Sequence, residues 1–241
     1  MHINIHNWGL PQYLDLLQKH QPFTLGKFGD GELACLFKLH GYSEVDHFGE
    51  KNIDGHRYFK ALGQAFHESF VNEKEYMKMC DPKWLGPVEQ FKHQPLFERY
   101  VRQFDIDPSK LRIHTHDWMY GGASRGELGP LKEELEKRNF IIVSEPRKRA
   151  LNIKYVDFVE VPAVNAWMDK TRIMKEVREM ADHYEDAVFG MMSGMPTLAM
   201  QDILYPDIGG KATMMSFGSI FDPYLGHPTR ILHNHYEVKS I

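Results

Sequence analysis

Apolar residues recur along this chain in two spacings, one typical of helices and one typical of buried strands. Stripes with apolar residues three and four positions apart predict helices at 10–20, 33–37, 57–70, 96–104, 128–138, 169–184 and 196–204. Short continuous or alternating apolar runs predict strands at 23–28, 111–116, 140–144, 155–161, 187–192 and 212–217. Strands that alternate with helices predict a mainly parallel sheet with helices on both faces.

The length of the chain sets the domain organisation that we expect. With 241 residues, of which 42% are hydrophobic, it can bury the core of one sizeable α/β domain. We therefore predict a single domain over residues 1–241. Residues 71–110 show no clear period apart from the helix at 96–104, and residues 121–126 are read as a loosened glycine segment.

Composition narrows the class of protein. The formal net charge of −4 and a pI near 6.4 provide no global basic field for nucleic acid, although a local patch can still bind DNA. Cys35 and Cys80 lack metal-site spacing and favour a reduced, cytoplasmic setting. No run approaches the roughly 20 apolar residues that cross a bilayer, so we expect no membrane span.

The richest local pattern is the segment from Phe23 to Leu33. An apolar strand ends in Lys27-Phe28, a Gly-Asp-Gly-Glu turn follows, and a helix begins. This geometry directs backbone N–H groups and the carboxylates of Asp30 and Glu32 toward one ligand, and such oxygens suit Mg²⁺ or Mn²⁺. An ordinary alternative makes Asp30 a helix N-cap and Glu32 a favourable first-turn acid.

The hexapeptide Lys27-Phe28-Gly29-Asp30-Gly31-Glu32 resembles the Arg-Phe-Gly-Asp-Gly-Glu signature of the GT-D glycosyltransferases, bacterial enzymes with a Rossmann-like fold. The resemblance implies a nucleoside-diphosphate-sugar donor and a divalent metal, with Asp30 and Glu32 in the catalytic and metal site. It also implies that Lys27, Gly29 and Gly31 line the donor site. Lys27 replaces the family's usual arginine, which keeps the charge and loses bidentate phosphate geometry.

Other candidate donor contacts lie beyond later strands. Ser193-Gly194 forms a second strand–glycine–helix junction whose free N–H groups can hold a phosphate; an ordinary capped helix is the alternative. Arg125, in the glycine segment, can clamp a diphosphate. The basic run Arg147 to Arg149 follows a strand and is either a solvated face or a contact for a phosphate-bearing partner.

The acceptor side is less well marked. The stretch from Gly210 to Asp222 loosely echoes the ending of GT-D sequences, and Asp222 is our candidate for the acceptor-side base. The residues expected to contact the sugar or the acceptor are Asp54, His56, His116 and Asp117. Asp54 and His56 can equally belong to a plain turn before a helix.

These observations predict a hexosyl- or pentosyltransferase that moves a sugar from a nucleoside-diphosphate sugar to a hydroxyl group. The acceptor is either a surface glycan or a hydroxymethylated pyrimidine in phage DNA, so the protein is expected in a bacterial cytoplasm and can be phage-encoded. A metal-dependent hydrolase that uses His114 and His116 is one alternative, because His-x-His on a strand places both rings on one face. A non-catalytic nucleotide-binding protein is the other.

Overall fold

The computed structural model describes residues 5–39, 41, 57–71, 77–80, 94–107, 113–115 and 117–225. Within this part of the chain, parallel strands form one sheet in the order β1-β4-β3-β2-β8-β7-β5-β6. The strands are β1 (Ile5–His6), β2 (Thr24–Phe28), β3 (Met77–Cys80), β4 (Ile113–Thr115), β5 (Asn139–Ser144), β6 (Asp157–Glu160), β7 (Ala187–Met192) and β8 (Thr213–Ser216). The prediction of a mainly parallel α/β sheet is confirmed, and the domain boundaries 1–241 stay a prediction.

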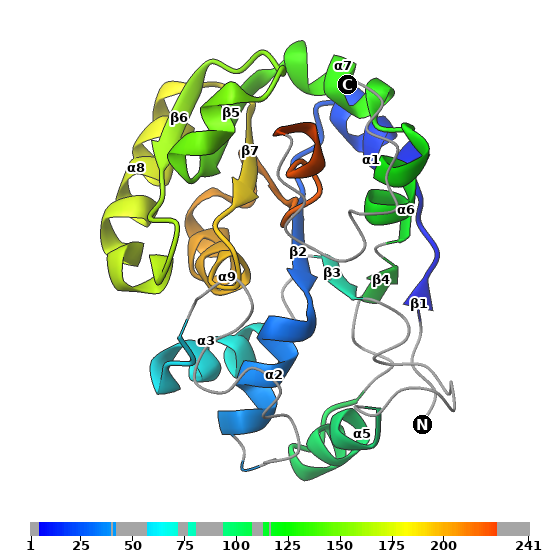
Figure 1. Cartoon of the computed structure of the whole chain (residues 1–241), viewed down its shortest axis with the longest axis vertical. Coiled ribbons are helices and arrows are strands. Elements are labelled where there is room, and N and C mark those ends of the chain that lie inside the picture. The colour runs from blue at the N-terminus through cyan, green and yellow to red at the C-terminus, as the bar shows by residue number, and fades with distance from the viewer. Residues whose placement is uncertain are drawn as a thin grey trace.

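Helices cover both faces of the sheet (Figure 1). One layer contains α2 (Asp30–Leu39), α3 (Lys60–Val71), α5 (Gln94–Gln103), α8 (Lys170–His183) and α9 (Thr197–Ile208). The other layer contains α1 (Leu10–Gln18), α6 (Asp117–Arg125) and α7 (Gly129–Glu136). Short 3₁₀ turns η3 (Pro146–Ala150), η4 (Ala166–Asp169) and η5 (Pro223–Leu225) follow β5, β6 and β8, respectively. The sheet thus separates two apolar cores.

Strand β5 shows how the sequence pattern builds both cores. Phe140 and Ile142 pack into the core under α1, α6 and α7, whereas Ile141 and Val143 pack into the core under α8 and α9. All four side chains are fully buried. Because successive side chains of a strand point to opposite faces, a strand covered on both sides needs a continuous apolar run, which this segment has.

Two described strands and one described helix escaped the sequence prediction. β1 has only two residues and β3 carries Lys78 in its centre, so neither has a readable period. α6 was expected to be a loosened glycine segment, and this was wrong. Gly121 and Gly122 lower its helix propensity, but Trp118 and Met119 bury their side chains in the core, and this packing outweighs propensity.

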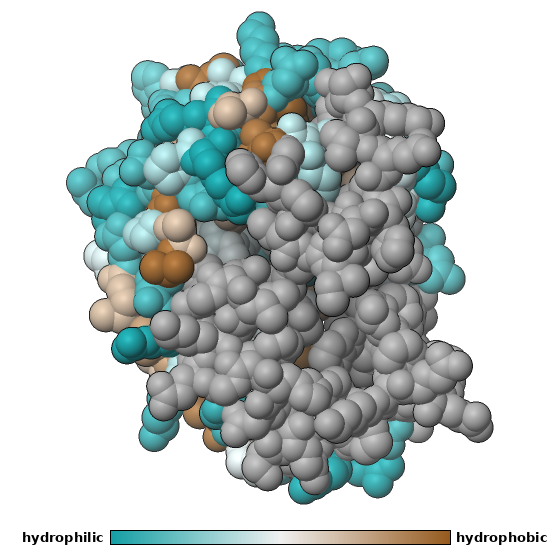
Figure 2. Space-filling view, in the orientation of Figure 1, coloured by the Kyte–Doolittle hydropathy of each residue, from teal (hydrophilic) through white to brown (hydrophobic). Residues whose placement is uncertain are grey.

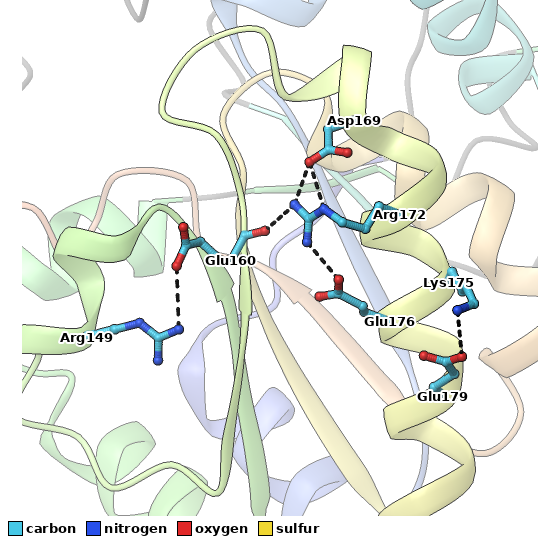
Figure 3. Close-up of polar contacts among 7 residues, drawn as sticks. All are labelled: Arg149, Glu160, Asp169, Arg172, Lys175, Glu176 and Glu179. Carbon is cyan, nitrogen blue, oxygen red and sulfur yellow. Dashed lines mark hydrogen bonds and ion pairs between the residues drawn. The ribbon is translucent and has the colours of Figure 1, made fainter.

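The outer face of α8 is tied to the end of β6 by charged side chains (Figure 3). The Arg172 guanidinium donates to the carboxylates of Asp169 and Glu176 at 2.9 and 2.8 Å and to the Glu160 carbonyl oxygen at 2.8 Å. These carboxylates raise the pKa of Arg172. The contacts join β6, η4 and α8 and so fix the loop between them.

The described part of the surface is mostly hydrophilic on the side where α8 lies (Figure 2). The exposed large hydrophobic side chains among the described residues are Val156, Val164, Met168 and Ile203. No helix within the described ranges has both the length and the apolar content that crossing a membrane requires.

The close packing of aromatic rings around Gly190 in β7 generates a stability prediction. A Cβ atom at this position would lie 2.7 Å from the Phe140 ring and 3.1 Å from the Phe217 ring, and both rings are fully buried. We expect Gly190→Ala to lower the free energy of unfolding by about 1–3 kcal/mol, the usual cost of overpacking a core. Urea unfolding of the purified variant measures this change.

Gly210→Ala is the control, because a Cβ atom there meets nothing within 4 Å. An unchanged free energy of unfolding for Gly190→Ala would contradict the close packing of β5, β7 and the segment after β8.

Candidate functional site

The carboxyl ends of β2, β8, β7 and β5 lie next to one another in the sheet. The residues just beyond these ends are Gly29, Phe217, Ser193 and Glu145. The chain continues from β2 to β3 on one side, whereas β8 lies on the other side, so the β2–β8 pair is a point where the strand order reverses. Open parallel sheets bind their ligands at such points, beyond the carboxyl ends of the strands.

Helix α2 begins immediately after β2. The Leu33 N–H donates to the Gly29 carbonyl oxygen at 3.1 Å, and the buried Glu32 carboxylate accepts the Gly29 N–H through Oε2 at 2.9 Å. Gly29 is therefore the N-cap residue and Glu32 the third helical residue, as in half of a capping box. Our alternative with Asp30 as N-cap is wrong, because Asp30 is already the first helical residue. The Asp30 side chain lies outside the described part of the structure.

Lys27, Glu32 and Tyr120 gather around glycine backbone at the β2–β8 pair. A Cβ atom on Gly29 would lie 2.8 Å from Lys27 Nζ and 2.9 Å from Glu32 Oε2. Lys27 Nζ also stands 5.3 Å from the centroid of the Tyr120 ring. Gly218, with a φ of +55°, would place a Cβ atom 3.1 Å from Tyr120 Oη and 3.8 Å from Lys27 Nζ. A lysine ammonium and a carboxylate thus share a small space where any side chain on Gly29 would intrude.

The junction after β7 leaves a buried hydroxyl group. The Ser193 N–H donates to Oγ1 of Thr197, the first residue of α9, at 3.0 Å, and Gly194 has a φ of +69°. The Ser193 side chain is 2% exposed, and its Oγ has no hydrogen-bond partner among the described residues. Buried polar atoms are rarely left unpaired, so this hydroxyl group is a candidate ligand contact.

The basic run after β5 is only partly solvated, because Arg147 and Arg149 are exposed whereas Lys148 points inward. Lys148 is 2% exposed and forms an ion pair with the carboxylate of Asp222, which is 3% exposed and follows β8. Arg147 Nη2 lies 3.4 Å from the same carboxylate, and Arg147 Nε donates to Glu145. Burial and the neighbouring Arg147 lower the pKa of Lys148 to about 7, and Glu145 acts in the opposite direction. An acceptor hydroxyl group would have to compete with Lys148 for the Asp222 oxygens.

Of the remaining predicted site residues, two are fully described by the structure and the others are not. Gly31 lies in the buried first turn of α2. Arg125 lies in the last turn of α6, and its exposed guanidinium pairs with Glu127 at 2.7 Å. Its expected contact with a diphosphate stays a prediction. The side chain of Asp117 and the residues Asp54, His56 and His116 lie outside the described part.

His114, on which the hydrolase alternative depends, is buried in an aromatic cluster. Its Nδ1 atom lies 3.0 Å from Tyr13 Oη, and its ring packs on His6 and Trp8 with centroids 5.2 and 5.1 Å away. No group of three or more His, Cys, Asp or Glu side chains within the described ranges is placed to hold a metal ion. The described residues therefore give the hydrolase alternative no support.

Sequence reasoning missed Tyr120, Gly218 and the inward direction of Lys148. Tyr120 belongs to the helix that we had predicted as a glycine loop; the apolar residues Trp118, Met119 and Ala123 on one face were the available signal. Gly218 belonged to the stretch that echoes the ending of GT-D sequences, but only Asp222 was singled out there. The burial of Lys148 had no sequence signal, because neighbouring basic residues are usually solvated.

Comparison with known proteins supports the fold. No protein-family model matches the chain, and no curated protein matches it. Two solved structures are similar: a selenomethionine-substituted domain of unknown function 1792, at TM-score 0.62 and 14% identity, and a structure described as showing that this domain "has a distinct glycosyltransferase fold", at TM-score 0.59 and 13% identity. Each match covers 98% of this chain and 84% of the other. The chain thus has a glycosyltransferase-like α/β fold, which confirms the resemblance at the level of fold.

The capping contact of Glu32 predicts how two substitutions affect stability. Glu32→Ala leaves the buried Gly29 N–H without its acceptor, and we expect a loss of about 1–2 kcal/mol in the free energy of unfolding. Glu32→Gln keeps a side-chain oxygen for this bond and should remain within about 0.5 kcal/mol of the wild type. Chemical denaturation measures both.

Glu133→Ala is the control, because Glu133 is an exposed glutamate on α7. Equal stability losses for Glu32→Ala and Glu133→Ala would show that the capping bond contributes nothing.

Proposed function

We propose that this protein is a glycosyltransferase that uses a nucleoside-diphosphate sugar and a hydroxyl acceptor. The observation that carries the proposal is the group formed by Lys27, Glu32 and Gly29 at the point where the strand order reverses. A lysine ammonium, a carboxylate that can hold a divalent cation and a glycine without a side chain in this position suit a diphosphate. The glycosyltransferase-like fold supports the same class of reaction, although a fold alone does not identify an activity.

In this proposal the donor diphosphate lies between the loops after β2 and β7. Lys27 provides a positive charge for it, while Ser193 provides a hydroxyl group and Gly194 a backbone N–H group. Glu32 is suited to hold a divalent cation together with Asp30, because one carboxylate can accept the Gly29 N–H and still offer its other oxygen to Mg²⁺ or Mn²⁺. When bound, such a cation neutralises charge that develops on the leaving diphosphate.

The proposal includes two candidate acceptors for the sugar. A surface glycan and a hydroxymethylated pyrimidine in phage DNA both present a hydroxyl group, and either fits a bacterial or phage-encoded protein that acts in the cytoplasm. We no longer propose Asp222 as the acceptor-side base, because its carboxylate is committed to Lys148 and Arg147. Asp54, His56, His116 and Asp117 keep their proposed contacts with the sugar or the acceptor.

Turnover of a panel of nucleotide sugars in the presence of Mn²⁺ tests the function. Slow donor hydrolysis is expected without any acceptor, and faster transfer on addition of oligosaccharides or of DNA that contains hydroxymethylated bases. Binding of nucleoside diphosphates without turnover would instead support a non-catalytic nucleotide-binding protein. Cleavage of phosphoesters that carry no sugar would support a hydrolase.

The proposed role of the acidic pair, Asp30 and Glu32, predicts that replacing either carboxylate lowers activity and leaves the protein folded. We expect Asp30→Asn and Glu32→Gln each to reduce sugar transfer by about 100-fold or more, which corresponds to the roughly 3 kcal/mol lost when one electrostatic stabiliser is removed. The transfer rate and the melting temperature are measured on the same samples. Glu133→Gln serves as the control, and wild-type turnover in both acidic-pair variants would contradict the role of this pair.

The proposed cation predicts a dependence on divalent metal. We expect EDTA to lower donor turnover by about tenfold or more, and Mn²⁺ or Mg²⁺ to restore it, because removing the cation removes electrostatic stabilisation of the leaving group. Glu32→Gln should then respond weakly to added Mn²⁺. Full activity in EDTA would show that side-chain cations alone stabilise the diphosphate.

A further inference from the structure

Arg147 has hydrogen-bonding capacity that the described structure does not use. Its Nε donates to Glu145, and its Nη2 lies 3.4 Å from Asp222, whereas its Nη1 makes no hydrogen bond within the described residues. The side chain is 36% exposed. A guanidinium group has several N–H donors in a planar fork that matches phosphate oxygens, so Arg147 can bind an anion without breaking its contact with Glu145.

The unpaired hydroxyl group of Ser193 lies at the same carboxyl edge of the sheet as Arg147. β5 and β7 are neighbours, with Ser144 opposite Met192, and Ser144 Oγ donates to the Met192 carbonyl oxygen at 3.1 Å. Glu145 and Ser193 are the next residues on the two strands, and η3, which carries Arg147, begins directly after Glu145. Adjacent strands are about 4.8 Å apart, so Arg147 and Ser193 belong to one small region of the carboxyl edge.

The Lys148–Asp222 ion pair fixes η3 in this place. Lys148 belongs to η3 and Asp222 to the segment after β8, and β7 runs between the strands that carry them. The pair therefore spans the end of β7, where Ser193 lies. Both side chains are almost fully buried and form an ion pair, so their charges are directed at each other rather than at a ligand. A buried ion pair is a poor source of stability compared with apolar packing, and a positioning role is one reason to keep it.

We propose that Arg147 and Ser193 together bind a phosphate group of the donor's diphosphate, and that the Lys148–Asp222 ion pair positions Arg147 for this contact. The inference rests on the proposed function, since it assigns additional residues to the same donor site. It makes Asp222 and Lys148 positioning residues. It also gives the diphosphate a second cationic contact, from the turn after β5, whereas Lys27 lies on β2.

Isothermal titration with UDP, GDP, ADP, dTDP and inorganic pyrophosphate tests the phosphate contact. Arg147→Met and Ser193→Ala should each weaken the binding of the nucleoside diphosphate that the wild type prefers by about tenfold, as loss of a charge-assisted or buried hydrogen bond predicts. Arg147→Lys should recover only part of the affinity, because lysine keeps the charge without the fork. Pyrophosphate should show the same ranking of variants.

Arg149→Met is the matched control, because Arg149 belongs to the same 3₁₀ turn. It lies 3.7 Å from Glu160 and over the Phe158 ring at 4.0 Å, away from Asp222. Nearly unchanged affinity for Arg149→Met supports a specific contact by Arg147. Equal weakening by Arg147→Met and Arg149→Met would overturn the proposal, because only the general positive charge would then matter.

The double variant Lys148→Met with Asp222→Asn tests the positioning role. Removing one partner alone leaves a buried charge and is expected to lower the melting temperature, whereas the double variant removes both charges and should recover most of it. A well-folded double variant that still binds the nucleoside diphosphate about tenfold more weakly supports positioning. A well-folded double variant with wild-type affinity would show that the ion pair is only structural and would overturn this part of the proposal.

The same titrations separate this inference from the proposed function. A wild-type protein that binds none of the probes contradicts both. A wild-type protein that binds a nucleoside diphosphate with no effect of Arg147→Met or Ser193→Ala contradicts the inference alone. Binding that depends on Arg147 and Ser193, in a protein that turns over no nucleotide sugar, supports the inference and contradicts the transferase.

Discussion

The parallel pairing of β2 with β8 joins an early and a late part of the chain at the centre of the sheet. Thr24 lies opposite Met214 and Leu25 opposite Met215, so the loops that follow these strands emerge side by side. The positions of Lys27, Gly29 and Gly218 relative to one another depend on this register. Parallel strands are slightly less favourable per residue and require long crossovers, and here the helices that cover both faces provide the apolar burial that holds the pairing.

Charged side chains are buried at both edges of this sheet, with different consequences. At the amino edge, Arg138 donates to the Leu17 carbonyl oxygen and pairs with Asp186 at 2.8 Å, which ties the end of α1 to the turn before β7. At the carboxyl edge, the Lys148–Asp222 pair adjoins Arg147 and the unpaired Ser193 hydroxyl group. In the first set, Arg138 Nε also lacks a hydrogen-bond partner among the described residues, although both Nη groups are paired. The second set lies at the carboxyl edge, where open parallel sheets bind their ligands, so it is the better candidate for a ligand contact.

Glycine has a specific structural role at the candidate donor site. Gly29 leaves room for the Lys27 ammonium and the Glu32 carboxylate to approach the backbone, and at the same time its N–H is the group that Glu32 caps. The motif therefore serves helix formation and site geometry together. The sequence analysis treated a capping role and a chemical role for Glu32 as alternatives. The two roles are compatible, because one carboxylate can perform both through different oxygens.

The amino-acid sequence by itself determined the fold class and marked a candidate donor site along the chain. The continuous apolar run of β5 and the stripes of α8 predicted a covered parallel sheet, and the segment from Lys27 to Glu32 marked a strand–turn–helix junction. Only the tertiary structure decided which basic residues turn inward. Lys148 and Arg149 are neighbours with similar local sequence, yet one is buried against Asp222 and the other lies near Glu160. Their partners come from distant strands, and the order of those strands is not encoded in any local period.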